Sequence, residues 1–187
     1  YIIPSDKSIV VQREIGKDIK DFETALEAIK DEDVDIVVVG SVKSAQVLES
    51  VIDIANTGRL VFATMDGRYA TSILGEIKNF FPEEKQTQIL NLLGDTLIGI
   101  SIQLLLPRVG GGRILITESL LATHPIKALI KEAKFSQIPN IMQTSGQEGM
   151  VNMDKALSGA VKEGKITIED AKEHAIDITQ FNLLVSH

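Results

Sequence analysis

The stretch Asp35-Ile-Val-Val-Val-Gly-Ser41 decides the fold of this 187-residue chain. It follows the charged run Lys30-Asp-Glu-Asp33 and is continuously apolar until it ends in Gly40 and Ser41. A short, unbroken Val/Ile run is typical of a parallel strand buried on both faces, because a strand with one wet face alternates apolar and polar residues. The stretch therefore predicts a central strand of an α/β sheet.

On either side of this strand, apolar runs alternate with segments of helical periodicity. Strands are predicted at 8–13 and 60–64, a turn and strand at 108–116, and either a strand or a helix end at 98–106. Helices are predicted at 19–30, from the Ser44 cap to Thr57-Gly58, and at 71–81, 82–94, 125–135, 147–162 and 167–175. The final residues, 176–187, carry no firm signal. This order predicts a mostly parallel α/β sheet followed by a mainly helical region.

The composition excludes several classes of protein. The net charge of −7 argues against nucleic-acid binding, which usually shows a basic patch. The chain has no cysteine, which excludes disulfides, thiol catalysis and thiolate metal sites. No stretch reaches the ~18 consecutive apolar residues of a membrane span. A protein of one domain, or of one domain with a small appendage, fits the length.

Two apparent binding motifs have plain structural explanations. The string G-x-x-x-x-G-K-[ST] of a phosphate-binding loop does not occur, so Gly110-Gly-Gly112 predicts a flexible turn into the strand that starts at Arg113. His124, His174 and His187 lack the i, i+4 spacing of a zinc site, and no metal site is predicted.

Three lysines fall on one face of the helix predicted after Pro125. Lys127, Lys131 and Lys134 are spaced for a single helical face. Such a face is usually solvated, but the same spacing suits docking to an acidic partner. Both interpretations stay open from the sequence.

The end of the central strand limits its chemistry. In nucleotide-hydrolysing proteins with a phosphate loop, the carboxyl end of the corresponding strand carries carboxylates that position Mg²⁺ and polarise water. The residue after Gly40 is Ser41, whose hydroxyl cannot act as a general base near neutral pH. The strand therefore predicts the architecture of an ATPase without its acid.

Six stretches carry a resemblance to a known family. They are Val11-Gln-Arg-Glu-Ile-Gly16, Asp35-Ile-Val-Val-Val-Gly40, Thr57-Gly-Arg-Leu-Val-Phe-Ala-Thr64, Phe81-Pro-Glu-Glu-Lys85, Gly110-Gly-Gly-Arg113 and Ile126-Lys-Ala-Leu-Ile-Lys-Glu132. In this order and spacing, from Ile9 to about Phe181, the chain resembles the C-terminal part of the twitching-motility (type IV pilus retraction) ATPases of the secretion ATPase superfamily.

The resemblance implies a fold and a setting. It implies the second half of a RecA-like motor core at 1–118, without the phosphate-loop strand, and a helical C-terminal region at 119–187. The family binds ATP and Mg²⁺ between subunits of a hexamer and drives pilus disassembly at the bacterial inner membrane. The implied partners are other motor subunits and the pilus inner-membrane platform protein, and the implied location is cytoplasmic, peripheral to that membrane.

Four positions depart from the family pattern where the family carries its catalysis. Ser41 stands in place of the catalytic Glu, Arg59 and Asp66 replace two histidines of the histidine box, and Glu76 replaces an Arg. No catalytic residue is therefore predicted in this chain. Losing a general base costs about 10²–10⁴-fold in rate, so turnover should be low.

Other positions keep a possible link to nucleotide. Gly40 and Arg13 match the family and are the predicted nucleotide-proximal residues, whereas Lys43 and Ser44 stand where the family has Arg and Asp. Arg13 would contact a phosphate across a subunit interface. The alternative is a surface ion pair of Arg13 with Glu14 or a neighbouring Asp.

Three hypotheses follow from these patterns. The chain is a non-catalytic interaction module of the family, or part of an active motor whose phosphate loop lies upstream of Tyr1, or an α/β domain that shares only the fold. The start at Tyr1 is interpreted as a truncation. A RecA-like sheet without its phosphate-loop strand should expose unpaired strand edges, which predicts self-association, rearrangement or a partner in the gap.

Overall fold

The computed structural model describes residues 2–144 and 149–186. They form two compact units, of which the first ends at Met65 and the second begins at Asp66. The predicted boundary between residues 118 and 119 lies within a strand of the second unit and stays a prediction.

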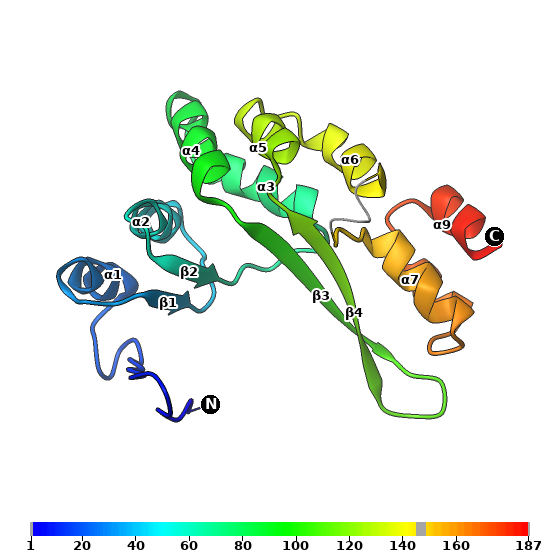
Figure 1. Ribbon diagram of the computed structural model, residues 1–187, viewed down its shortest axis with the longest axis horizontal. Coiled ribbons are helices and arrows are strands. Elements are labelled where there is room, and N and C mark those ends of the chain that lie inside the picture. Colours follow the sequence, from blue (N-terminus) through cyan, green and yellow to red (C-terminus); the bar gives the residue numbers. More distant parts are fainter. Residues whose placement is uncertain (1, 145–148, 187) are drawn as a thin grey trace. The chain divides into compact units, whose positions relative to one another are not determined.

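Two helices and a pair of parallel strands make up the first unit (Figure 1). In chain order these elements are α1 (Phe22–Asp31), β1 (Ile36–Val39), α2 (Ala45–Asn56) and β2 (Leu60–Ala63). The Ser44 side chain accepts a hydrogen bond from the N–H of Val47, which confirms the predicted cap of α2. Ile36 lies opposite Leu60 and Val39 opposite Ala63, so the predicted central strand pairs in parallel with the next strand along the chain.

The β1–β2 pair is buried on one face only. Val37 and Val39 are buried, and α1 packs beside α2, which packs on β2. The opposite face exposes Ile36, Val38, Leu60 and Phe62. The expectation of a strand buried on both faces is therefore wrong for β1, because within this unit helices cover only one side.

The strand predicted at 8–13 does not form. Ile9 is 92% exposed and Val11 is 70% exposed, and no strand pairs with this segment among the described residues. Near its centre, the N–H of Val10 donates to Oγ of Ser5 at 3.0 Å. A strand is stabilised by pairing rather than by the intrinsic preference of Ile and Val, so the composition alone was misleading.

A long hairpin with helices packed on it forms the second unit (Figure 1). Its elements are α3 (Ala70–Asn79), α4 (Glu83–Thr96), β3 (Gly99–Pro107), β4 (Arg113–Leu121), α5 (His124–Lys131), the 3₁₀ helix η1 (Phe135–Gln137), α6 (Ile138–Thr144), α7 (Met153–Lys162), α8 (Ile168–His174) and α9 (Ile178–Ser186). Helix α4 ends at Thr96, so the ambiguous segment 98–106 is a strand.

The two long strands are antiparallel. Gly99 lies opposite Leu121 and Pro107 opposite Arg113, and the predicted glycine turn at 110–112 joins the strands. All three glycines have positive φ, which confirms the turn and explains the residue type. The prediction of a mostly parallel sheet is wrong here, because a short turn can only join antiparallel neighbours.

Close approach of the backbones explains the glycine at the start of β3. A Cβ atom at Gly99 would lie 2.8 Å from the carbonyl oxygen of Leu120 on the partner strand. We expect Gly99→Ala to lower the free energy of unfolding by about 1–3 kcal/mol, since the clash is with backbone that cannot rotate away. Chemical denaturation measures this. Gly159→Ala, where a Cβ would meet nothing within 4 Å, is the control.

The helical C-terminal region departs from the predictions in several places. The helix predicted at 125–135 ends at Lys131, and α6 was not predicted. Helix α7 begins at Met153 rather than at Gln147, and residues 147 and 148 lie outside the described part of the chain. Helix α9 was missed, although Asp177 begins it by accepting bonds from the N–H groups of Thr179 and Gln180. An Asp followed three residues later by Gln is a helix-start signal that the weak periodicity of 176–187 concealed.

Two further findings concern membrane spans and metal sites. Across residues 2–144 and 149–186, none of the helices combines the length and the apolar character needed to cross a bilayer. The same residues contain no cluster of His, Asp and Glu that could hold a metal ion.

Candidate functional site at the carboxyl edge of the parallel strands

The carboxyl ends of β1 and β2 bring Gly40, Ser41 and Thr64 together. The N–H of Ser41 donates to Oγ1 of Thr64 at 2.6 Å, and the N–H of Val42 donates to the Thr64 carbonyl at 2.8 Å. The N–H of Thr64 in turn donates to the carbonyl of Val39 at 3.1 Å. In open α/β sheets, ligands bind outside this edge of the strands.

Ser41 holds an uncommon backbone conformation. Its φ is +56°, in the left-handed region, where only one other described non-glycine residue, Ala133, is found. A side chain in this region costs roughly 1–2 kcal/mol relative to the ordinary helical region. Such conformations gather at binding sites, and here the bonds to Thr64 hold the turn in place.

Next to this turn lies a helix end suited to an anion. Helix α2 starts at Ala45, and its first turn carries no acid. Free N–H groups and the helix dipole favour a negative group at such an end. Lys43, which is exposed, makes no ion pair with any residue that the structure describes. Lysine, hydroxyls and helix N–H groups together suit a phosphate.

The same edge lacks what a magnesium-dependent hydrolysis requires. From Gly40 to Ala45 and at Thr64 and Met65 there is no carboxylate. Mg²⁺ is bound through carboxylates, hydroxyls and phosphate oxygens, and water needs a positioned base. Within this unit, the edge could therefore hold a phosphate group, but it does not fit a catalytic Mg²⁺ site.

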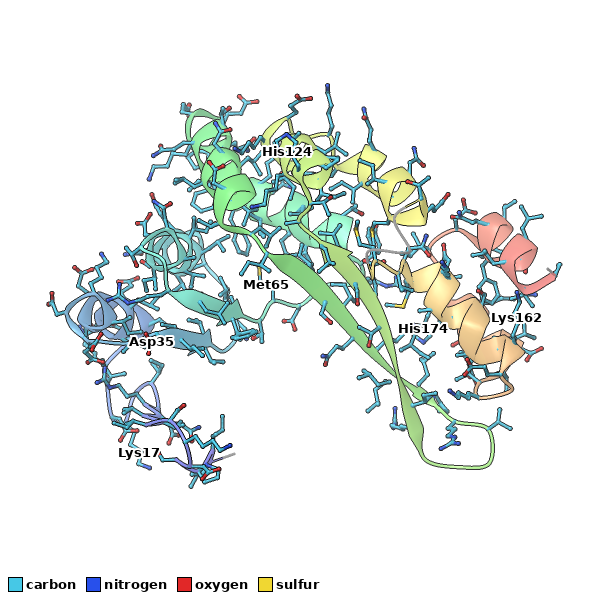
Figure 2. The ribbon with its side chains drawn as sticks, viewed as in Figure 1. Lys17, Asp35, Met65, His124, Lys162 and His174 are labelled. Atoms are coloured by element: carbon cyan, nitrogen blue, oxygen red, sulfur yellow. The ribbon has the colours of Figure 1, made fainter. Side chains whose placement is uncertain are left out.

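Arg59 and Arg13 lie at the opposite end of the strands. The Arg59 guanidinium donates to the carbonyls of Val34 and Glu32, each at 3.1 Å, just before β1. The amino end of β1 is marked by Asp35 in Figure 2. Arg59 and Thr64 are five residue steps apart along β2, a span of roughly 16 Å at ~3.3 Å per residue. Arg59 therefore caps the end of α1 and does not reach the carboxyl edge.

Arg13 makes an ion pair at that same amino end. Its guanidinium lies 2.6 Å from Oε1 of Glu32, not beside Glu14 or an Asp. Both side chains are about one-third exposed, with values of 35% and 38%, so the pair stabilises the fold only weakly. Gly40 thus lies at the carboxyl edge, whereas Arg13, the other residue expected near nucleotide, does not.

The remaining two divergent positions belong to the second unit. Asp66 is its first residue, and Glu76 lies on the exposed face of α3. Their charges face solvent within that unit.

The three lysines that the sequence left open as a solvated or a docking face make contacts within the second unit. Nζ of Lys131 lies 2.5 Å from Oδ1 of Asp95, and Nζ of Lys127 donates to the Asp95 carbonyl at 3.1 Å. Lys134 pairs with Glu132. Asp95 lies in the last turn of α4, whose terminal carbonyls attract cations. Lys127 and Lys131 therefore join α5 to the end of α4, whereas Lys134 lies beyond the end of α5.

A buried carboxylate that the sequence did not single out organises the second unit. Glu118 is only 3% exposed. Its Oε1 accepts from the N–H of Ala70 at 2.5 Å, and its Oε2 accepts from the N–H of Met153 at 3.0 Å. Ala70 and Met153 are the first residues of α3 and α7, so one side chain caps two helices.

The environment of Glu118 disfavours its charge. Burial raises the pKa of Glu118 above its ordinary value, while the two N–H bonds oppose this shift and the nearby Asp154 adds to it. The signal was present in the sequence: Ile114, Ile116 and Leu120 recur at every second position on one face of the strand, and Glu118 occupies the same face. A lone acid on the apolar face of a strand indicates a buried partner.

A second buried acid continues the chain of contacts. Asp154, in the first turn of α7, is 3% exposed. Its two oxygens accept from the N–H groups of Ile176 and Asp177, at 2.7 and 3.1 Å. Asp154 thereby fixes the start of α9, which buries Phe181.

Relatives of known description match almost the whole chain. The type IV pilus retraction ATPase PilT of Pseudomonas aeruginosa is 33% identical over 175 residues, which are 94% of this chain and 51% of the relative. A twitching motility protein of Neisseria gonorrhoeae is 32% identical over 176 residues, covering 94% and 47%. The chain is homologous to the C-terminal half of the pilus retraction ATPases. This retraction-ATPase homologue spans about half the length of the curated relatives it matches.

Solved structures agree with this assignment. The pilus retraction motor PilT with bound ADP has a TM-score of 0.89 at 38% identity and covers 96% of this chain and 51% of its own. The ATPase DotB of Yersinia pseudotuberculosis, at 20% identity and a TM-score of 0.78, covers 89% and 43% and shares the fold. The predicted α/β fold class is confirmed. No protein-family model matches the chain.

Proposed function

We propose that this retraction-ATPase homologue is a catalytically impaired member of its family that serves as an interaction module. The observation that carries the proposal is Ser41, which follows Gly40 at the carboxyl end of β1. Ser41 lies in a left-handed turn, and its backbone N–H donates to Thr64. The hydroxyl of Ser41 cannot deprotonate water. Without a carboxylate at this edge, hydrolysis would lack its base.

Nucleotide binding is compatible with this proposal. The relative PilT was solved with ADP. In this chain, Lys43, the hydroxyls of Ser41 and Thr64 and the start of α2 would face a phosphate at the carboxyl edge. ATP, when bound, would supply a phosphoanhydride bond. The residues here would hold and orient its phosphate without activating water.

The partners follow from the family. We infer that the protein assembles with other motor subunits, as a homo- or hetero-oligomer, and meets the pilus platform protein on the cytoplasmic side of the inner membrane. Its packing residues support a scaffold role, because the capping residues Ser44, Glu118 and Asp154 all make the bonds that a stable fold needs. Erosion without selection would have lost such contacts as readily as the catalytic residues.

An ATPase assay on the full-length protein tests the proposal. The unmodified protein is expected to turn over far below the ~1 s⁻¹ at which ordinary enzymes begin. Ser41→Glu is expected to raise hydrolysis by about tenfold or more, because it restores a carboxylate at the strand end. Ser8→Glu, at an exposed serine, is the matched control and should change nothing.

Two outcomes would contradict the proposal. Hydrolysis by the unmodified protein at the rate of a working motor would favour the alternative, an active retraction motor. Equal rates for the unmodified protein and Ser41→Glu, with ATP bound in both, would show that the missing carboxylate is not what limits turnover.

A further inference from the structure

The outer edge of β4 presents unpaired backbone groups. Ser119 uses its outward N–H and C=O to form a bridge with Val151, at 2.8 and 3.0 Å. Backbone groups alternate between the two sides of a strand, so those of Thr117 and Leu115 point the same way as those of Ser119. No described residue bonds to them from that side.

Beyond β4, the described residues extend this two-stranded sheet only by an isolated bridge. Val151 pairs at one position only, because the chain turns into α7 at Met153. An extended backbone that continued past this bridge, along Thr117 and Leu115, would find a row of free donors and acceptors. Proteins normally cover or charge such an edge.

A groove of about 340 Å³ lies along this part of the edge. Its walls are residues 114–117 of β4 and one face of α7, whose C-terminal end is marked by Lys162 in Figure 2. The α7 wall is formed largely by residues with small side chains, Ala156, Gly159 and Ala160. Small side chains leave room for a backbone to approach, and Ile114 and Ile116 supply apolar contact.

Charge at the groove limits what can occupy it. Lys165 pairs with Glu163 at 2.5 Å, so these two charges satisfy each other. Lys155, which also lines the groove, has no ion pair within residues 2–144 and 149–186. The groove therefore favours a ligand with a carboxylate near Lys155.

We propose that the β4–α7 groove binds an acidic, extended peptide segment of a partner protein, which adds as a strand to the edge of β4. Main-chain bonds to Thr117 and Leu115 give affinity, and Lys155 selects an acidic side chain. A second copy of this chain fits less well. Its segment 8–13 carries Arg13 and no acid. The proposal does not depend on nucleotide chemistry.

Binding of a defined probe by the full chain tests this. The probe is a fluorescein-labelled peptide, Asp-Val-Thr-Val-Thr-Val, followed by fluorescence anisotropy. Thr117→Pro removes the outward N–H without touching the bonds to β3 and is expected to weaken binding by about tenfold or more. Gln103→Pro is the matched control. Gln103 lies opposite Thr117, and its replacement by proline removes an outward N–H from the other edge of the hairpin. It should bind as the unmodified chain does.

A charge exchange keeps the test independent of folding. Lys155→Glu is expected to weaken the Asp probe and to strengthen binding of the same peptide with Lys in place of Asp. Absence of saturable binding by the unmodified chain, or equal binding by Thr117→Pro and Gln103→Pro, would overturn the proposal. So would self-association of the unmodified chain that Thr117→Pro abolishes, since the occupant would then be a second copy.

Discussion

Replacing Glu118 with alanine is expected to lower the free energy of unfolding by about 3–5 kcal/mol, since each hydrogen bond to a charged group contributes ~1.5–3 kcal/mol. The substitution removes the acceptor of two N–H groups, those of Ala70 and Met153. Both would stay buried at the starts of α3 and α7 without partners. Chemical denaturation followed by circular dichroism measures the loss. Glu173→Ala, at an exposed glutamate of α8, should change stability by less than about 0.5 kcal/mol.

The pH dependence gives a second measure of the same residue. Burial raises the pKa of Glu118, so the folded protein holds this proton more tightly than the unfolded chain. Between the ordinary pKa of Glu, about 4.3, and the raised value, the folded state binds more protons, and stability falls as pH rises. Glu118→Gln lacks this titration. The stability advantage of the unmodified protein over Glu118→Gln should therefore shrink as pH rises through that window, and a growing advantage would contradict the raised pKa.

Asp154→Ala is expected to release α9 from the second unit. The carboxylate accepts from the N–H groups of Ile176 and Asp177, and its loss should cost about 3 kcal/mol. Because Phe181 is the buried residue of α9 and the rest of the second unit has its own core, we expect local opening of α9 rather than global unfolding. Hydrogen exchange of the α9 amides should accelerate by roughly a hundredfold, since 1.4 kcal/mol corresponds to a factor of ten.

A matched acid separates this effect from a loss of charge. Glu169 also lies in the first turn of a helix, α8, but it is exposed. Glu169→Ala should leave the exchange of α9 unchanged. Equal acceleration in both variants would mean that Asp154 acts through the helix dipole and not through its two bonds to the α8–α9 connection.

Local rules predicted most elements because their signals lie close together in sequence. The Ser44 cap and the Gly110–Gly112 turn each depend on bonds within a few residues, and both are confirmed. The segment 8–13 failed for the opposite reason. A strand depends on a partner elsewhere, and no local pattern shows whether that partner exists.

The candidate site was predicted in part. Gly40 and Ser41 lie at the carboxyl edge, as parallel pairing requires, and the bond of Ser41 to Thr64 follows from the same pairing. The sequence could not place Arg59, because it gave no indication that the side chain turns back to the carbonyls of Val34 and Glu32. Glu118 was missed because its strand was expected to end at Ile116, two residues before Glu118 and five before its observed end at Leu121.

The two bonds of Glu118 also bear on the order of synthesis. Its partners lie 48 residues before it and 35 residues after it. A nascent chain emerges from its N-terminal end, so Ala70 is available when Glu118 appears, whereas Met153 is not yet made. During that interval the carboxylate has one donor and the apolar face of β4 has no α7 to cover it. Folding of the second unit is therefore completed only after α7 has been synthesised. A ribosome stalled before Met153 would carry a hairpin whose apolar face is not covered by α7.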